Sequence, residues 1–294
     1  MADLATQEVG LNEDRTTEVM TVNIGPHHPA THGVLRLVVD LEGEIVRECR
    51  PVIGYVHTGI EKSCEDKSYW KVIPFVERMD YVSYFFQMEA YCGAVERLVG
   101  LEIPPRARYL RTLFLELNRI HSHLVWLGTT ALDLGAISML WYCFRERDKI
   151  LDLFEMATGQ RMHTRYFQVG GVIEDIPVGF EEKLREFIAD DRKYVLPPRS
   201  ELSTSMESLI HHFKLVTEGF RVDPGEVYYG IESPRGELGC FVLADGSSKP
   251  ARVHFRDPSF VNLQSFRDMA VDTYVADMIC SLGMLDPILG GVDR

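Results

Sequence analysis

Three segments with helical spacing of apolar residues fill the middle of the sequence and constrain its fold more than any other feature. They cover residues 77–99, 106–127 and 137–158, where apolar side chains recur every three or four positions. A Pro-Pro pair separates the first two segments, and Gly159 follows the third as a residue typical of helix ends. Long helices with short connections bury their apolar stripes against one another, so the spacing predicts a helical bundle.

Alternating patterns flank the helical segments and predict β-structure on both sides. Residues 17–57 alternate between apolar and polar positions with a turn at 41–44, and β patterns return over 222–253 with a hairpin turn at Asp245-Gly246. We therefore expect an α+β fold with a helical bundle between two β regions. The expected parts are an N-terminal arm (1–16), an antiparallel N-terminal β region (17–59), the bundle (60–221, with shorter helices over 180–189 and 203–218) and a C-terminal β region with a terminal helix (222–294).

The charge balance and the cysteines exclude several classes of function. The net charge is −13 and the pI about 5.2, which argues against binding of nucleic acid because phosphate contacts need clustered Lys and Arg. Six cysteines are scattered without a C-x-x-C pair, so a self-contained zinc or iron–sulfur site is not expected and a reducing compartment is favoured. The N-terminus lacks the apolar core of a secretory signal and no run of 18 apolar residues occurs, so a membrane role would come through partners.

A rigid histidine loop precedes the second predicted strand. Residues 25–34 hold three histidines between two glycines and two prolines, and each proline fixes φ and restricts the residue before it. Such a loop can aim an imidazole, and His32 is the first candidate proton donor because its ordinary pKa lies near physiological pH. The alternative is a turn with a packed histidine.

Two further side chains could take part in proton chemistry. Tyr81 near the start of the first helical segment offers a hydroxyl donor, or else it is a tyrosine at the edge of the core. Asp133 lies between leucines and could orient a histidine, or else cap the following helix. The pair His121 and His123 does not share a helix face, which makes a metal site there unfavourable.

Six motifs occur in one order, and together they resemble the 49 kDa (D) subunit family of respiratory complex I, the proton-pumping NADH:quinone oxidoreductase. The match covers about residues 17–294. The motifs are Gly25-Pro26-x-His28-Pro29-x-Thr31-His32-Gly33, Gly54-Tyr55-x-His57-x-Gly59-x-Glu61-Lys62, Arg78-x-Asp80-Tyr81, Glu116-Leu117-x-Arg119-x-x-Ser122-His123, Glu232-Ser233-x-Arg235-Gly236-Glu237 and Pro258-Ser259-Phe260-x-Asn262-Leu263-Gln264.

The resemblance extends to the large subunit of nickel–iron hydrogenases, which is related to this family and implies a similar scaffold. The two thiolate pairs that bind metal in those enzymes fall here on Asp80 and Ser83 and on Ile288 and Gly291. Because all four thiolates are absent, the resemblance implies no metal in this chain. It also implies that the quinone headgroup takes the place of the former metal centre.

The resemblance implies a role for each matching residue. His32 and Tyr81 match the pair that hydrogen-bonds the quinone carbonyls, and Asp133 matches the acid that pairs with the histidine. Arg78 and His163 match positions beside an iron–sulfur cluster that a neighbouring subunit carries. The matching pocket positions are Gly33, Val34, Thr129, Asp286 and Ile288.

The implied function is therefore the quinone-site subunit of complex I, without a redox cofactor of its own. The expected substrate is ubiquinone or menaquinone, and the expected partners are the terminal [4Fe-4S] subunit (B), the 30 kDa subunit (C) and the quinone-channel membrane subunit (H). The expected location is peripheral, on the cytoplasmic side of the bacterial inner membrane. The alternatives are the equivalent subunit of a related complex with another electron donor, or a structural assembly subunit.

One departure from the family pattern lies near residues 190–195, where members continue through a long central segment. Either the sequence omits this segment or the protein lacks it. A true deletion would leave apolar helix faces of the bundle uncovered, which favours an omission.

Overall fold

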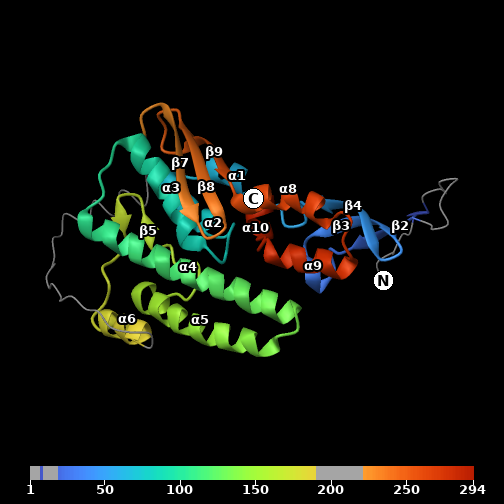
Figure 1. Cartoon of the computed structure of the whole chain (residues 1–294). Coiled ribbons are helices and arrows are strands. Elements are labelled where there is room, and N and C mark those ends of the chain that lie inside the picture. Colours follow the sequence, from blue (N-terminus) through green and yellow to red (C-terminus); the bar gives the residue numbers. More distant parts are fainter. Residues whose placement is uncertain (1–6, 9–18, 190–220) are drawn as a thin grey trace.

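The computed structural model describes residues 7–8, 19–189 and 221–294 (Figure 1). The helix expected over 203–218 and the departure near 190–195 lie outside these residues. Of the predicted arm, only β1 (Gln7–Glu8) is described, and it pairs antiparallel with β2 (Val19–Ile24).

A helical bundle forms the centre of the molecule, as the apolar spacing predicted. The short helices α1 (Ile60–Glu65) and α2 (Tyr69–Val76) precede the long α3 (Tyr84–Val99), α4 (Pro105–Asp133) and α5 (Ile137–Thr158). The last two lie side by side (Figure 1), and a Cβ added at Gly128 would be 3.3 Å from Cys143 Cβ. Helix α6 (Phe180–Ala189) and the two-residue strands β5 (Phe167–Gln168) and β6 (Gly171–Val172) complete this part.

Helix α3 begins seven residues later than the sequence predicted. The Asp80 carboxylate accepts hydrogen bonds from the amides of Val82 and Ser83, at 3.2 and 3.0 Å. Side-chain bonds of this kind compete with helical hydrogen bonding, so the chain from Glu77 to Ser83 bends instead of continuing the helix. As a result, Tyr81 lies on an irregular segment and not on a helix face.

The first hydrophobic core joins the bundle to a C-terminal sheet. Strands β7 (Gly225–Ser233), β8 (Gly236–Ala244) and β9 (Pro250–Arg256) form an antiparallel meander beside α3 (Figure 1). Aromatic rings fill the centre of the bundle at centroid separations of 4.9 to 5.9 Å, which suit tilted aromatic pairs. The rings are those of Phe85, Phe114, Phe154 and Phe167.

A second hydrophobic core lies under the N-terminal sheet. Strands β3 (Arg36–Glu42) and β4 (Ile45–Val52) pair antiparallel with a turn at 43–44, and β2 pairs with β3. Alternate residues of β3 point inward. Helices α8 (Pro258–Ala270), α9 (Val275–Met284) and α10 (Leu289–Asp293) contribute the other apolar residues of this core. The chain therefore crosses from the first core to the second after β9.

This mixture of helices and antiparallel sheets confirms the expected α+β class. In the described part of the chain, no helix combines the length and the apolar character that crossing a membrane would need.

Candidate functional site

A cavity of about 420 Å³ lies where the two cores meet. Val34 and Val56 on its wall pack against the second core, whereas Ile60 and Phe75 pack against the first. Apolar walls with few polar groups are typical of a site for a small organic ligand. The lining residues are His32, Val34, Val56, Thr58, Ile60, Phe75, Arg78, Tyr81, Leu289 and Gly290. The cavity thus brings together four of the predicted residues, namely His32, Val34, Arg78 and Tyr81.

His32 reaches the cavity from a loop that local hydrogen bonds hold rigid. His28 Nδ1 accepts a bond from the amide of Ala30 at 3.2 Å, and the Thr31 hydroxyl donates to the His28 carbonyl at 3.0 Å. His32 itself ends this turn in the left-handed region, with φ of 56°. Burial lowers the pKa of His32, while Asp133 and a hydrogen bond to the backbone of Pro287 act in the opposite direction. A neutral imidazole at physiological pH follows, with one N–H donor.

Tyr81 stands against the terminal segment of the chain. A Cβ added at Gly290 would lie 2.3 Å from the Met79 carbonyl oxygen and 3.4 Å from Tyr81 Cε1, so only glycine permits this approach. Burial, reinforced by Asp80 and Asp286 and opposed by Arg235, raises the pKa of Tyr81. The phenol therefore stays protonated at neutral pH and can donate a hydrogen bond.

Asp293 fixes another wall of the cavity. Its carboxylate accepts hydrogen bonds from the amides of Gly54 and Val56, at 2.8 and 2.9 Å, and its carbonyl oxygen lies 2.6 Å from His57 Nδ1. These contacts hold the loop that carries Val56 and Thr58 against the end of the chain. The sequence contained this loop within the Gly54–Lys62 motif, but no sequence pattern predicted its contacts with Asp293.

Asp133 lies at the end of α4 and is exposed, beside a small hollow lined by Cys280 and Gly283. It raises the pKa of His32 through space, and no hydrogen bond joins the two among the bonds of the described residues. The predicted pairing of Asp133 with His32 therefore stays a prediction.

Of the two residues predicted to lie beside a partner's cluster, Arg78 lines the cavity and His163 does not. Arg78 is exposed and donates from Nη1 to the Pro74 carbonyl at 2.6 Å. Burial and then the charge of Arg78 lower the pKa of His163. Glu77 precedes Arg78, and its backbone forms a hydrogen bond with His163. Its Oε2 accepts a bond from the Arg165 amide at 3.1 Å, and its Oε1 is buried without a partner among the described residues.

Glu77 should make stability depend on pH near neutrality. Burial raises the pKa of Glu77 from 4.5 to about 7, so the folded chain favours the protonated acid. The stabilisation of the folded chain that comes from protonated Glu77 is fully present below pH 4.5 and is lost as pH rises through 7. We expect Glu77→Gln to match the wild type near pH 4.5 and to exceed its melting temperature near pH 8, in thermal denaturation of the complex that contains the chain. A difference that does not change with pH would contradict this assignment.

Comparisons with known proteins place the chain in a family. A family model described as "Respiratory-chain NADH dehydrogenase, 49 Kd subunit" matches residues 133–190 and 185–294. The D 2 subunit of NADH-quinone oxidoreductase from Chloroflexus aurantiacus is 40% identical, over 95% of each chain. The D 2 subunit from Koribacter versatilis is 38% identical over 96% of this chain and 97% of its own, and the D subunit from Acidothermus cellulolyticus is 38% identical over 96% and 93%. The chain belongs to the 49 kDa subunit family. The resemblance drawn from the six motifs is thereby confirmed.

Relatives in the 49 kDa family have positions that this sequence lacks. The alignment with the Chloroflexus protein spans 390 positions and the chain has 294 residues, so at least 96 positions, the difference between the two, have no counterpart here. The family model matches in two pieces that meet at residues 185–190. The break therefore falls beside the departure noted near 190–195.

Several positions expected in the pocket of a 49 kDa family member do not line the cavity. Thr129 is exposed on α4, and its hydroxyl donates to the Val125 carbonyl at 2.9 Å. A Cβ added at Gly33 would have no other atom within 4 Å, so Gly33 faces open space. The amide of Ile288 donates to Ser259 Oγ at 3.4 Å, while Leu289 and Gly290 face the cavity instead.

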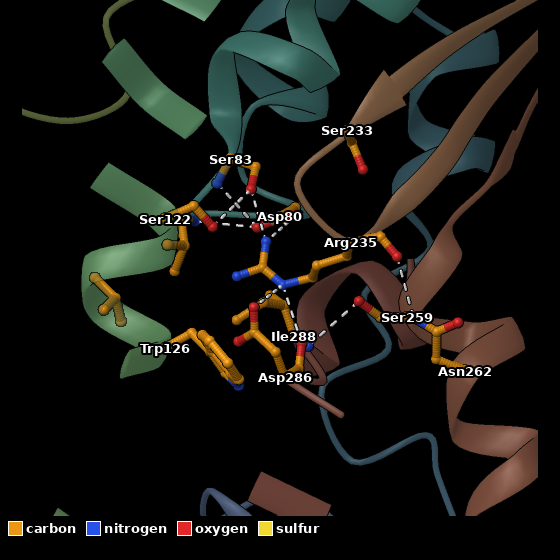
Figure 2. Close-up of polar contacts among 12 residues, drawn as sticks. Asp80, Ser83, Ser122, Trp126, Ser233, Arg235, Ser259, Asn262, Asp286 and Ile288 are labelled. Carbon is orange, nitrogen blue, oxygen red and sulfur yellow. Dashed lines mark hydrogen bonds and ion pairs between the residues drawn. The ribbon is translucent and has the colours of Figure 1, made fainter. Parts of the chain in front are cut away.

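Two of the four positions compared above with metal-binding thiolates, Asp80 and Ser83, contact an arginine side chain. Asp80 and Ser83 bind the guanidinium of Arg235, which also reaches Asp286 (Figure 2). The expected place of the quinone headgroup stays a prediction: the arginine lies between Asp80, Ser83 and Asp286, and the cavity opens beside it at Tyr81. The sequence contained Arg235 within a family motif, but its pattern gave no role for the residue.

Proposed function

We propose that this chain is the quinone-site subunit of a proton-pumping NADH:quinone oxidoreductase, and that the cavity at the junction of the two cores receives the quinone headgroup. The observation that carries the proposal is that His32 and Tyr81, two hydrogen-bond donors from distant segments, line one largely apolar cavity. The names of the relatives, which are D subunits of NADH-quinone oxidoreductase, support the same reaction.

The chemistry of the reaction matches these two donors. Reduction of a quinone to a quinol adds two electrons and two protons, and negative charge develops on both carbonyl oxygens. A neutral imidazole N–H and a phenol O–H stabilise that charge by hydrogen bonding, and the phenol, or the imidazole once it is protonated, can pass on a proton. Burial favours the neutral His32 ring, which keeps one N–H donor, and Asp133 favours the imidazolium if the ring gains a proton.

The proposed source of the electrons is the iron–sulfur cluster of a neighbouring subunit (B). Arg78, which lines the cavity, and His163 are the positions proposed to lie beside that cluster. The positive charge of Arg78 already acts on His163 by lowering its pKa, so the two side chains share one electrostatic environment. The 30 kDa subunit (C) and the quinone-channel membrane subunit (H) are the other proposed neighbours. The proposed location is peripheral, on the cytoplasmic side of the bacterial inner membrane.

Photolabelling of the intact complex tests this function. An azido-quinone irradiated with the complex in its membrane should label the segments that line the cavity, which lie within residues 25–36, 56–81 and 286–292. An excess of unmodified quinone should prevent the labelling, which separates specific from random attachment. Competed labelling elsewhere in the complex, with none in these segments, would overturn the proposal.

A further inference from the structure

Arg235 is a buried arginine at the tip of the β7–β8 hairpin. The turn has Ser233, Pro234, Arg235 and Gly236 in sequence, a pattern typical of a type I turn. The side chain of Arg235 is only 2% exposed, and the Asn262 amide donates to the Arg235 carbonyl at 3.2 Å. The turn is thus anchored to α8, and its guanidinium points into the protein (Figure 2).

The guanidinium joins the two segments that form the walls beside Tyr81. Nη1 donates to Asp80 Oδ2 at 2.8 Å and to Ser83 Oγ at 2.6 Å, on the segment that carries Tyr81. Nε donates to the carbonyl oxygen of Asp286 at 3.0 Å and lies 2.9 Å from its Oδ2, on the segment that leads to Gly290. One planar, rigid donor group therefore bridges both walls, which a flexible ammonium could not do with the same geometry.

The same group balances the charges around the phenol. Asp80 and Asp286 both raise the pKa of Tyr81, and Arg235 lowers it. Asp257, at the start of α8, is a further carboxylate near this arginine and is buried. Without the guanidinium, these carboxylates would repel one another and draw apart, because like charges in a buried site are destabilising.

We propose that Arg235 is a positioning residue for quinone reduction, which holds Tyr81 at the cavity wall through Asp80, Ser83 and Asp286. This inference rests on the proposed function. Arg235 does not line the cavity, so it acts on the quinone only through the side chains it holds. Small displacements of a catalytic donor have large kinetic effects, since a shift of about 1 Å can cost about 100-fold in rate.

The test is a double-mutant cycle in the assembled complex. Arg235→Lys retains the positive charge but loses the planar guanidinium with its several N–H donors. We expect kcat/KM for quinone to fall about 100-fold. In a Tyr81→Phe background, the same Arg235→Lys change should cost no more than about twofold, because the hydroxyl that Arg235 positions is already gone. A purely structural arginine would lower kcat/KM by the same factor in both backgrounds, and that result would overturn the inference.

Arg111→Lys is the matched control, because Arg111 is equally buried, binds two carboxylates and lies away from the cavity. It should leave kcat/KM for quinone unchanged in assembled complexes. Ser83→Ala is the milder second variant: it removes one acceptor of Arg235 and should lower kcat/KM several-fold. If Arg235→Lys does not assemble, unchanged kinetics in Ser83→Ala would overturn the inference.

The cycle also separates this inference from the proposed function. If Tyr81→Phe alone leaves quinone turnover unchanged, the proposed function fails at this site. If Tyr81→Phe lowers turnover as expected and Arg235→Lys has no effect, only the positioning role fails.

Discussion

Tyr81→Phe is expected to lower quinone reduction about 100-fold or more while the complex still assembles. The substitution removes one hydroxyl and leaves the ring that packs against Gly290. A positioned proton donor contributes typically about 100-fold to 10,000-fold to a rate. Because Tyr81 is 41% exposed at the cavity, loss of its hydroxyl should have little effect on folding. The measurement compares NADH:quinone turnover with NADH:ferricyanide turnover in isolated membranes, after a native gel has shown assembly.

Tyr55→Phe is the matched control for this prediction. Tyr55 is 46% exposed on the neighbouring loop and does not line the cavity, so removal of its hydroxyl should leave quinone turnover unchanged. Loss of quinone turnover in Tyr81→Phe, with ferricyanide reduction retained, would support donation from this phenol. Unchanged quinone turnover would mean that Tyr81 only packs at the cavity edge. Loss of both activities without an assembled complex would indicate a structural role.

Local sequence patterns predicted the elements whose stability is itself local. The apolar stripe of α5 and the glycine after it defined that helix from residue 137 to 158, as observed. Alternation over residues 17–57 likewise predicted the β-structure to which β3 belongs. The predicted start of α3 was wrong, because apolar periodicity does not reveal that the Asp80 side chain accepts hydrogen bonds from the amides that follow it.

The candidate site was predictable only through family motifs, because its contacts join distant parts of the chain. Asp80 and Arg235 are separated by 155 positions, and Gly54 and Asp293 by 239. No local pattern states that a hairpin tip reaches the segment before α3, or that the end of the chain binds a loop near its start. The motifs singled out His32 and Tyr81, which the structure brings to one cavity, whereas the position of Arg235 had to come from the structure.

Arg111 stabilises the bundle through the most extensive buried ion-pair network described in the chain. Its side chain is 3% exposed, and its guanidinium lies 3.1 Å from Glu89 and 2.6 Å from Glu96, both on α3. Nη2 also donates to the carbonyls of Gln168 and Gly171, at 2.7 and 3.0 Å. One side chain of α4 thereby joins α3 to the β5–β6 ribbon.

Arg111→Met should destabilise the chain by about 3–5 kcal/mol, because removal of one member of a buried ion pair leaves the other charges uncompensated. Burial already raises the pKa of Glu89 and Arg111 opposes this, so the variant should favour protonated Glu89 more strongly. Protonation of Glu89 stabilises the folded variant at low pH, and this contribution is lost as pH rises. The loss of stability in the variant should therefore be smaller near pH 5 than near pH 8. Thermal and denaturant unfolding of the full chain, or of the complex that contains it, measures the loss.

Arg106→Met provides the comparison on the same helix. Arg106 pairs with Asp175 at 2.9 Å, but both side chains are 54% exposed, so solvent screens the pair. An exposed pair contributes at most about 1 kcal/mol, even with the two-pronged geometry seen here. If the two variants lost similar stability, the packing of arginine side chains on α4 would account for the loss. The buried ion pairs of Arg111 would then contribute no more than the exposed pair of Arg106. A large loss of stability confined to Arg111→Met would show that the bundle is destabilised by buried carboxylates that have lost their arginine.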